Sequence, residues 1–109
     1  MALPSGVEGE RIAIDGPGGV LAGRLYRPAA GARPGTVLWV RGGGFCILGH
    51  LDQDVVSPRL ALESGRTVVT FEYRLSPEHP SPAAVEDSFA ALLWTAENAP
   101  AIGGGSDRV

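Results

Sequence analysis

Three consecutive glycines directly after an apolar run form the first candidate site of this chain. The run is Thr36-Val37-Leu38-Trp39-Val40, and Arg41-Gly42-Gly43-Gly44-Phe45 follows it. Glycine lets other groups come close to the backbone N–H donors. Successive N–H groups in such a loop can form a nest for an anion or for the oxyanion of an acyl-transfer intermediate. Arg41 could hold an oxygen of the same group. The alternative is a tight strand-to-loop turn that does no chemistry.

Two histidines and three carboxylates form the second candidate site. They occur in two segments of the sequence, which contribute His50, Asp52 and Asp54, and Glu78 and His79. Imidazole and carboxylate groups suit a divalent metal such as zinc, and a bound metal can activate water without a serine nucleophile. The spacing matches no established metal motif. The alternative is that these residues are structural, and that Asp52 and Asp54 cap the following helix.

The strands that must position these residues can be identified from the residue pattern. Polar and apolar residues alternate at 10–15, and an extended pattern covers 20–26 after a Gly/Pro link. Together they predict an antiparallel hairpin. The β-branched and aromatic runs at 36–40 and 66–73 predict a third and a fourth strand.

One helix is predicted after the third strand and another after the fourth. The first ends at Gly65; Ser57 caps it with Pro58 in its first turn, or else the helix begins earlier and kinks there. The second begins at Ser81-Pro82 and ends at Ala99-Pro100. Its apolar residues fall on one face at helical spacing: Val85, Phe89, Leu92, Leu93 and Ala96.

The order of these elements predicts an α/β fold with parallel strands and helices packed against the sheet. The loop that follows the third strand carries the glycines, His50, Asp52 and Asp54, and the loop that follows the fourth carries Glu78 and His79. Since neighbouring parallel strands end at the same edge of a sheet, these two loops are expected to converge there.

Several linked motifs, in order, resemble the N-terminal part of the hormone-sensitive-lipase-like esterases of the α/β-hydrolase fold. They are Arg41 to Phe45 followed by Leu48-Gly49-His50-Leu51-Asp52, then Glu72 to Pro80, and then Pro82 to Asp87. The resemblance runs from about residue 12 to residue 109. It implies the N-terminal half of an α/β-hydrolase sheet, made of an antiparallel hairpin, two parallel strands and two helices. It also implies that Gly43 and Gly44 are oxyanion-hole donors, with Arg41 where the family has histidine.

The family's nucleophile elbow, Gly-x-Ser-x-Gly, does not occur in this chain. By the resemblance, residues 1–109 are a single truncated domain that stops before the strand carrying the serine. In the family the third strand pairs with the fourth and with a fifth, so without the fifth its edge would be open to another chain. We therefore expect a homodimer in which two third strands pair about a two-fold axis, with the last helix packed on the partner.

Composition limits the partners. The 109 residues fit one domain, and the net charge of −3 without any basic stripe argues against nucleic acid. No apolar run is long enough to span a bilayer, and the N-terminal residues lack the pattern of a secretion signal. The single Cys46 cannot form an internal disulfide. We expect a cytoplasmic protein without a membrane partner.

The sequence thus predicts a hydrolase of esterase descent that acts on small activated esters or phosphoesters. The predicted mechanism uses no Ser-His-Asp triad and is assisted by a metal, with the glycine nest holding the oxyanion. The alternatives are a catalytically inactive esterase fragment, a half-domain that only self-assembles, and a fragment that complements the rest of an esterase chain.

Overall fold

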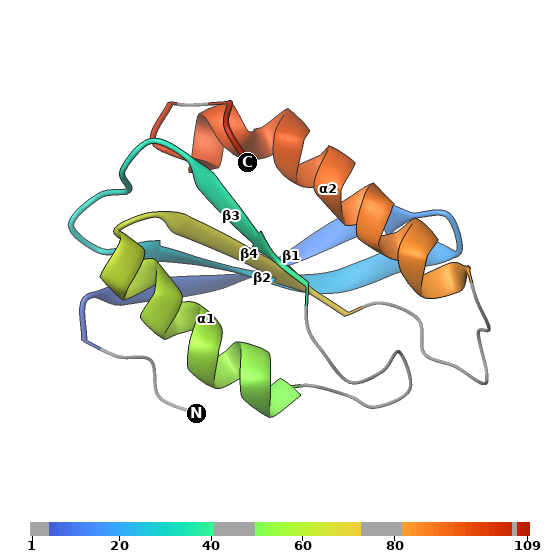
Figure 1. The fold of residues 1–109 in the computed structure, drawn as a ribbon, viewed down its shortest axis with the longest axis horizontal. Helices are drawn as coiled ribbons and strands as arrows, with labels where there is room; N and C mark the ends of the chain where they lie inside the picture. The colour runs from blue at the N-terminus through green and yellow to red at the C-terminus, as the bar shows by residue number, and fades with distance from the viewer. Residues whose placement is uncertain (1–4, 41–49, 73–81, 106) are drawn as a thin grey trace.

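The structure is a computed structural model of the chain, and it describes residues 5–40, 50–72, 82–105 and 107–109. For residues 50–55 it describes the backbone alone. Figure 1 shows the elements in chain order. They are β1 (Val7–Gly16), β2 (Gly19–Pro28), β3 (Thr36–Trp39), α1 (His50–Ser64), β4 (Thr67–Phe71) and α2 (Ala83–Ile102).

The four described strands form one mixed sheet in the order β1-β2-β4-β3. β1 and β2 are an antiparallel hairpin that closes at Gly16↔Gly19. β2 pairs antiparallel with β4, and β4 pairs parallel with β3 from Thr36↔Thr67 to Trp39↔Thr70. The predicted hairpin, parallel pair and two helices are therefore confirmed.

The two helices cover opposite faces of β4, whose five residues are all buried. On one face Val68 packs in a cluster with Val7, Tyr26 and Ala61 of α1. On the other face Phe71 lies in a cluster with Ile14, Leu21 and the α2 residues Ala84 and Ala91. Because successive strand residues point to opposite faces, β3 follows the same division, with Trp39 near the first cluster and Leu38 near the second.

The first helix begins earlier than a Ser57 cap would allow. α1 starts at His50 and continues through Pro58, so the prediction of a helix start at Ser57 is wrong and the alternative of an earlier start is confirmed. Its predicted end at Gly65 is also confirmed. Gly65 has φ +70°, and its N–H donates to the carbonyl of Ala61 at 2.9 Å.

The second helix ends later than predicted. α2 passes through Pro100 to Ile102, and the Gly103 N–H donates to the Ala99 carbonyl at 2.6 Å. Contacts with the sheet hold this last turn. The Thr67 hydroxyl donates to the Ile102 carbonyl, and the Gly35 N–H donates to the Gly103 carbonyl at 3.0 Å. These tertiary hydrogen bonds give partners to carbonyls at the helix end that have no intrahelical donor.

The two faces of α2 differ in the size of their side chains. The face against the sheet carries small residues, including the buried Ala84, Ala91 and Ala99, which let the helix approach closely. The large apolar residues of the predicted apolar face are about half exposed. The small apolar residues of α2 therefore pack on the sheet, and its larger apolar residues face solvent. Within the described residues, neither helix combines the length and apolar character needed to cross a membrane.

Candidate oxyanion site at the carboxyl edge of the sheet

The candidate site is built on the ends of two parallel strands. The last pair of the β3–β4 ladder is Trp39↔Thr70, one residue before β4 ends at Phe71. Both strands run in the same direction, so the segments that follow them leave the sheet at the same edge. The glycine segment comes directly after β3, and the segment with Glu78 and His79 comes directly after β4. The fold thus brings the starting points of the two predicted loops together.

The helices return from this same edge. α1 begins at His50 and α2 begins at Ala83, each after a parallel strand, and Figure 1 shows both starts on the side where β3 and β4 end. The first turn of a helix has N–H groups without intrahelical partners and a partial positive charge. Two such termini make this edge favourable for negative charge, as an oxyanion site requires.

The predicted site residues are placed only in part. Arg41, Gly43, Gly44, Glu78 and His79 lie outside the described residues. The backbone of α1 places His50, Asp52 and Asp54 in its first five residues, but their side chains are also outside the description. Among the described side chains there is no group of three or more His, Cys, Asp or Glu residues that could hold a metal ion.

Asp87 is a buried polar residue that the sequence analysis named only as the last residue of a motif. Its side chain is fully buried on the small-residue face of α2, in line with Ala84 and Ala91. Spacing was the signal that could have identified it, because positions 84, 87 and 91 share one helical face. A carboxylate among small residues indicates a residue that faces the sheet.

Two further buried polar atoms lie on the α1 side of the sheet. Trp39 Nε1 and Ser57 Oγ have no hydrogen-bond partner among the residues that the structure describes. Trp39 is the last residue of β3 and packs on the apolar cluster under α1. Its indole therefore supports the strand end from which the glycine segment begins.

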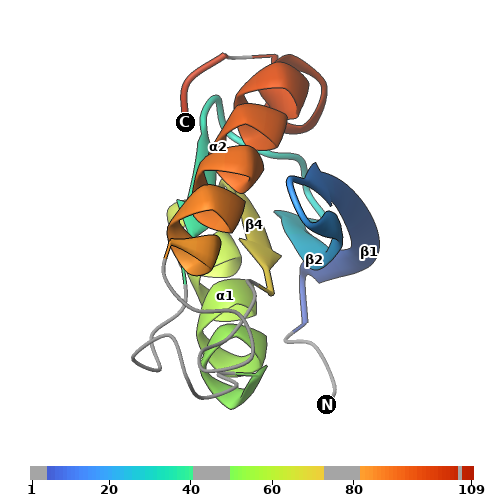
Figure 2. The same cartoon turned by 90° about the vertical axis from the view of Figure 1, so that its right-hand side faces the viewer.

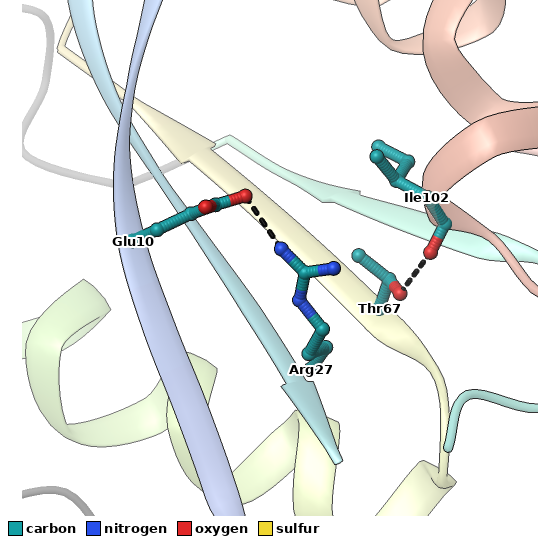
Figure 3. A network of polar contacts seen from close by, with 4 residues as sticks. All are labelled: Glu10, Arg27, Thr67 and Ile102. Atoms are coloured by element: carbon teal, nitrogen blue, oxygen red, sulfur yellow. Dashed lines mark hydrogen bonds and ion pairs between the residues drawn. The ribbon is translucent and has the colours of Figure 1, made fainter. Parts of the chain in front are cut away.

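The polar contacts in Figure 3 belong to the opposite edge of the sheet. Arg27 Nη2 donates to Glu10 Oε1 at 2.5 Å across the hairpin, and Thr67 at the start of β4 donates to Ile102. Both contacts lie near the amino ends of β3 and β4. Arg27 follows Tyr26, which pairs with Val68 close to the start of β4. They hold the scaffold together and leave the carboxyl edge to the candidate site.

Comparison with known proteins agrees with this geometry. A family profile described as alpha/beta hydrolase fold matches residues 37–109. Esterase LipI of Mycobacterium tuberculosis is 41% identical over 102 residues, which are 90% of this chain and 32% of the relative. An arylesterase of Saccharolobus solfataricus is 36% identical over 87 residues, 79% of this chain and 28% of that protein.

Solved structures give the same result. An esterase from Pyrobaculum calidifontis superposes with a TM-score of 0.81 at 44% identity, covering 90% of this chain and 32% of that one. The carboxylesterase EstE1 from a metagenomic library superposes with a TM-score of 0.84 at 36% identity, covering 98% of this chain and 35% of that one. The chain thus spans about a third of the length of the relatives that it matches. With the sheet order, the two helices and the matched residues all in agreement, this chain belongs to the alpha/beta hydrolase fold family.

Proposed function

We propose that this chain takes part in the hydrolysis of carboxylic esters and supplies the oxyanion-stabilising part of the site. The observation that carries the proposal is the parallel pairing of β3 and β4 up to Trp39↔Thr70. Because of this pairing, the segment with Gly43 and Gly44 starts at the sheet edge where both helices begin. The names of the relatives, an esterase and an arylesterase among them, support ester bonds as the substrate class.

The proposed chemistry follows from where charge develops. When a nucleophile adds to an ester carbonyl, the carbonyl oxygen becomes negative, and N–H donors at about 2.7–3.1 Å stabilise it. Gly43 and Gly44 would donate these N–H groups, and Arg41 would add a fixed positive charge beside them. The sequence has no Gly-x-Ser-x-Gly elbow. The proposal therefore assigns the oxyanion donors to these residues, and the nucleophile needs a source other than an elbow within residues 1–109.

A metal-bound water is one such source, and it gives the narrower form of the proposal. His50, Asp52, Asp54, Glu78 and His79 would provide its ligands, and an activated ester or phosphoester would be the substrate. In α1 positions 50 and 54 are one helical turn apart, whereas position 52 lies on the other side of the helix axis. The helix therefore favours His50 with Asp54 as the pair that would approach one ion.

The test is hydrolysis by the purified chain of para-nitrophenyl butyrate and of a para-nitrophenyl phosphotriester, with and without a chelator. We expect ester turnover that Gly44→Ala reduces by at most about 10²–10³-fold, the cost of losing one oxyanion donor outright. Alanine keeps the backbone N–H, and its Cβ disturbs the backbone angles and the close approach that glycine allows. The control is Gly31→Ala, since Gly31 has positive φ, has no atom within 4 Å of an added Cβ, and lies between β2 and β3.

The outcomes separate the mechanisms. Turnover that disappears with the chelator and returns with zinc would support the metal-assisted form. Turnover that is unchanged by the chelator but falls with Gly44→Ala would support a mechanism that uses the oxyanion loop without a metal. No turnover by the wild-type chain on either substrate would contradict activity of the chain by itself and would favour the inactive fragment.

A further inference from the structure

Asp87 is a charged residue in the interior of this chain. Among the described residues with buried side chains it is the one charged residue, and its exposed fraction is 0%. A carboxylate is rarely fully buried unless hydrogen bonds or an opposite charge compensate for its lost hydration. Asp87 does take part in a polar interaction. The identity of its partner therefore decides what this residue does.

The surface on which Asp87 packs is apolar. Ala84 and Ala91, which lie one helical turn to either side of it, belong to one cluster with Phe71 and residues of the β1–β2 hairpin. Figure 2 shows α2 and α1 on opposite sides of β4, so this cluster lies between α2 and the sheet. None of the clustered side chains has a hydrogen-bond donor. The partner of Asp87 therefore comes from outside the cluster.

The described hydroxyl groups on this side of the sheet are engaged or distant. Ser88 and Thr95 each donate to a carbonyl of their own helix, at 2.8 and 2.7 Å. Thr36 and Thr67 lie against the end of α2. With a rise of about 1.5 Å per residue, that end is roughly 22 Å along the helix axis from Asp87. These hydroxyls leave the carboxylate without a donor near the start of the helix.

The segment that precedes α2 can supply such a donor. Residues 73–81 join the end of β4 to the start of α2, and Asp87 lies only about 6 Å along the axis from that start. Arg74 is the one arginine of this segment, and the segment contains no lysine. It follows Phe71 by three residues, a span of at most about 11 Å, and Phe71 belongs to the cluster under Asp87. A guanidinium can donate to both oxygens of a carboxylate at once.

We propose that Asp87 is a positioning residue of the candidate site and that its buried carboxylate holds the guanidinium of Arg74. The pair would fix the start of residues 73–81 against α2, at the edge of the sheet where the glycine segment also begins. This inference rests on the proposed function, because the same segment carries Glu78 and His79. Asp87 would act on the site through Arg74 and would not touch the substrate.

The first test is amide hydrogen exchange of the chain, measured by mass spectrometry on peptides that cover 73–81 and 7–28. Asp87→Asn keeps the size of the side chain and removes its charge. We expect exchange in 73–81 to rise roughly 10- to 100-fold, as for loss of a hydrogen bond to a charged group, and exchange in the hairpin peptide 7–28 to change little. Arg74→Gln should give the same local rise, and it serves as the second variant if Asp87→Asn does not fold.

Thr95→Val is the matched control. Thr95 is also 0% exposed on the sheet side of α2, and its hydroxyl donates to the Ala91 carbonyl within the helix. Valine removes this buried polar group with little change of shape. A purely structural effect of losing a polar group under α2 would therefore appear in Thr95→Val as well. We expect Thr95→Val to leave exchange in 73–81 unchanged.

The second test is a double-mutant cycle in urea unfolding. Asp87→Asn and Arg74→Gln should each raise the unfolding equilibrium constant roughly 10- to 100-fold. The double variant should unfold about as easily as the weaker single variant, because both changes break the same pair. Arg41→Gln is the comparison, since Arg41 is assigned to the oxyanion. Its effect should multiply with that of Asp87→Asn.

Two results would overturn the proposal. One is exchange in 73–81 that Asp87→Asn and Arg74→Gln both leave unchanged. The other is a cycle in which Asp87→Asn multiplies with Arg74→Gln, or couples to Arg41→Gln in its place. Ester turnover by the wild-type chain is measured separately. Absence of turnover together with the expected exchange and coupling would contradict the proposed function and support the Asp87–Arg74 pair.

Discussion

Replacing Gly103 by alanine should weaken the joint between α2 and β3. The backbone angle at Gly103 is not the obstacle, since its φ of −104° suits any residue. An added Cβ would lie 2.2 Å from Thr36 Oγ1 and 2.8 Å from the Ala99 carbonyl oxygen, well inside van der Waals contact. Neither neighbour can move freely, because Thr36 is 4% exposed and the Ala99 carbonyl accepts the Gly103 N–H. The end of the helix must therefore shift from the sheet by roughly 1 Å, and overpacking of this kind costs about 1–3 kcal/mol. We expect the upper end of that range, a large fraction of the stability of a small domain.

Urea unfolding, followed by tryptophan fluorescence and circular dichroism, would measure this cost. Gly31→Ala is the matched control, since it forces a side chain onto a φ of +108° without any atom within 4 Å of the Cβ. It isolates backbone strain, at about 1–2 kcal/mol. Adding Thr36→Ala to Gly103→Ala should recover part of the loss, with a coupling of about 1 kcal/mol. The reasoning would be refuted if Gly103→Ala cost no more than Gly31→Ala, or if the double variant showed no coupling.

Three further substitutions test the packing around the site by the same unfolding assay. Ser57→Ala should stabilise the chain by up to about 1 kcal/mol, since Ser57 Oγ is buried and has no partner among the described residues; a clear loss of stability would contradict this. Asp87→Ala should destabilise by about 1–3 kcal/mol or more, because a fully buried carboxylate with a polar partner is removed, while the neighbouring Glu86→Ala should change little. Arg27→Ala should cost less than about 1 kcal/mol, since Arg27 and Glu10 are 38% and 54% exposed in their ion pair; a cost that is larger and independent of salt would show that this pair is more than a surface contact.

Local residue patterns were sufficient to predict most of the fold. The Gly/Pro link around Gly16 and Gly19 indicated the hairpin, and the β-branched run before Phe71 indicated the fourth strand. Gly65 indicated a helix end because a positive φ suits glycine. Each of these features is decided by neighbours in the sequence, which is why a pattern can reveal it.

The features that were not predicted correctly depend on contacts between residues that are distant in the sequence. The extra turn of α2 after Pro100 is held by Thr67 and Gly35, which are far away in the sequence. The side of α2 that packs on the sheet is decided by how closely the helix approaches, so that Ala91 is buried while Phe89 is exposed. Apolar periodicity alone identifies a hydrophobic face and does not reveal what covers it. The candidate site combines both difficulties, since its glycine and metal residues are predicted from sequence and lie outside the described side chains.

β3 links the sheet to the proposed site, because its carboxyl end at Trp39 leads into the glycine segment. Its parallel pairing with β4 up to Trp39↔Thr70 fixes the point from which that segment starts. The packing of Trp39 on the cluster that contains Val68 and Ala61 ties this strand end to both β4 and α1. The proposed oxyanion donors therefore depend on residues that the described sheet and helix hold in place, and those residues can be tested by the unfolding assay above.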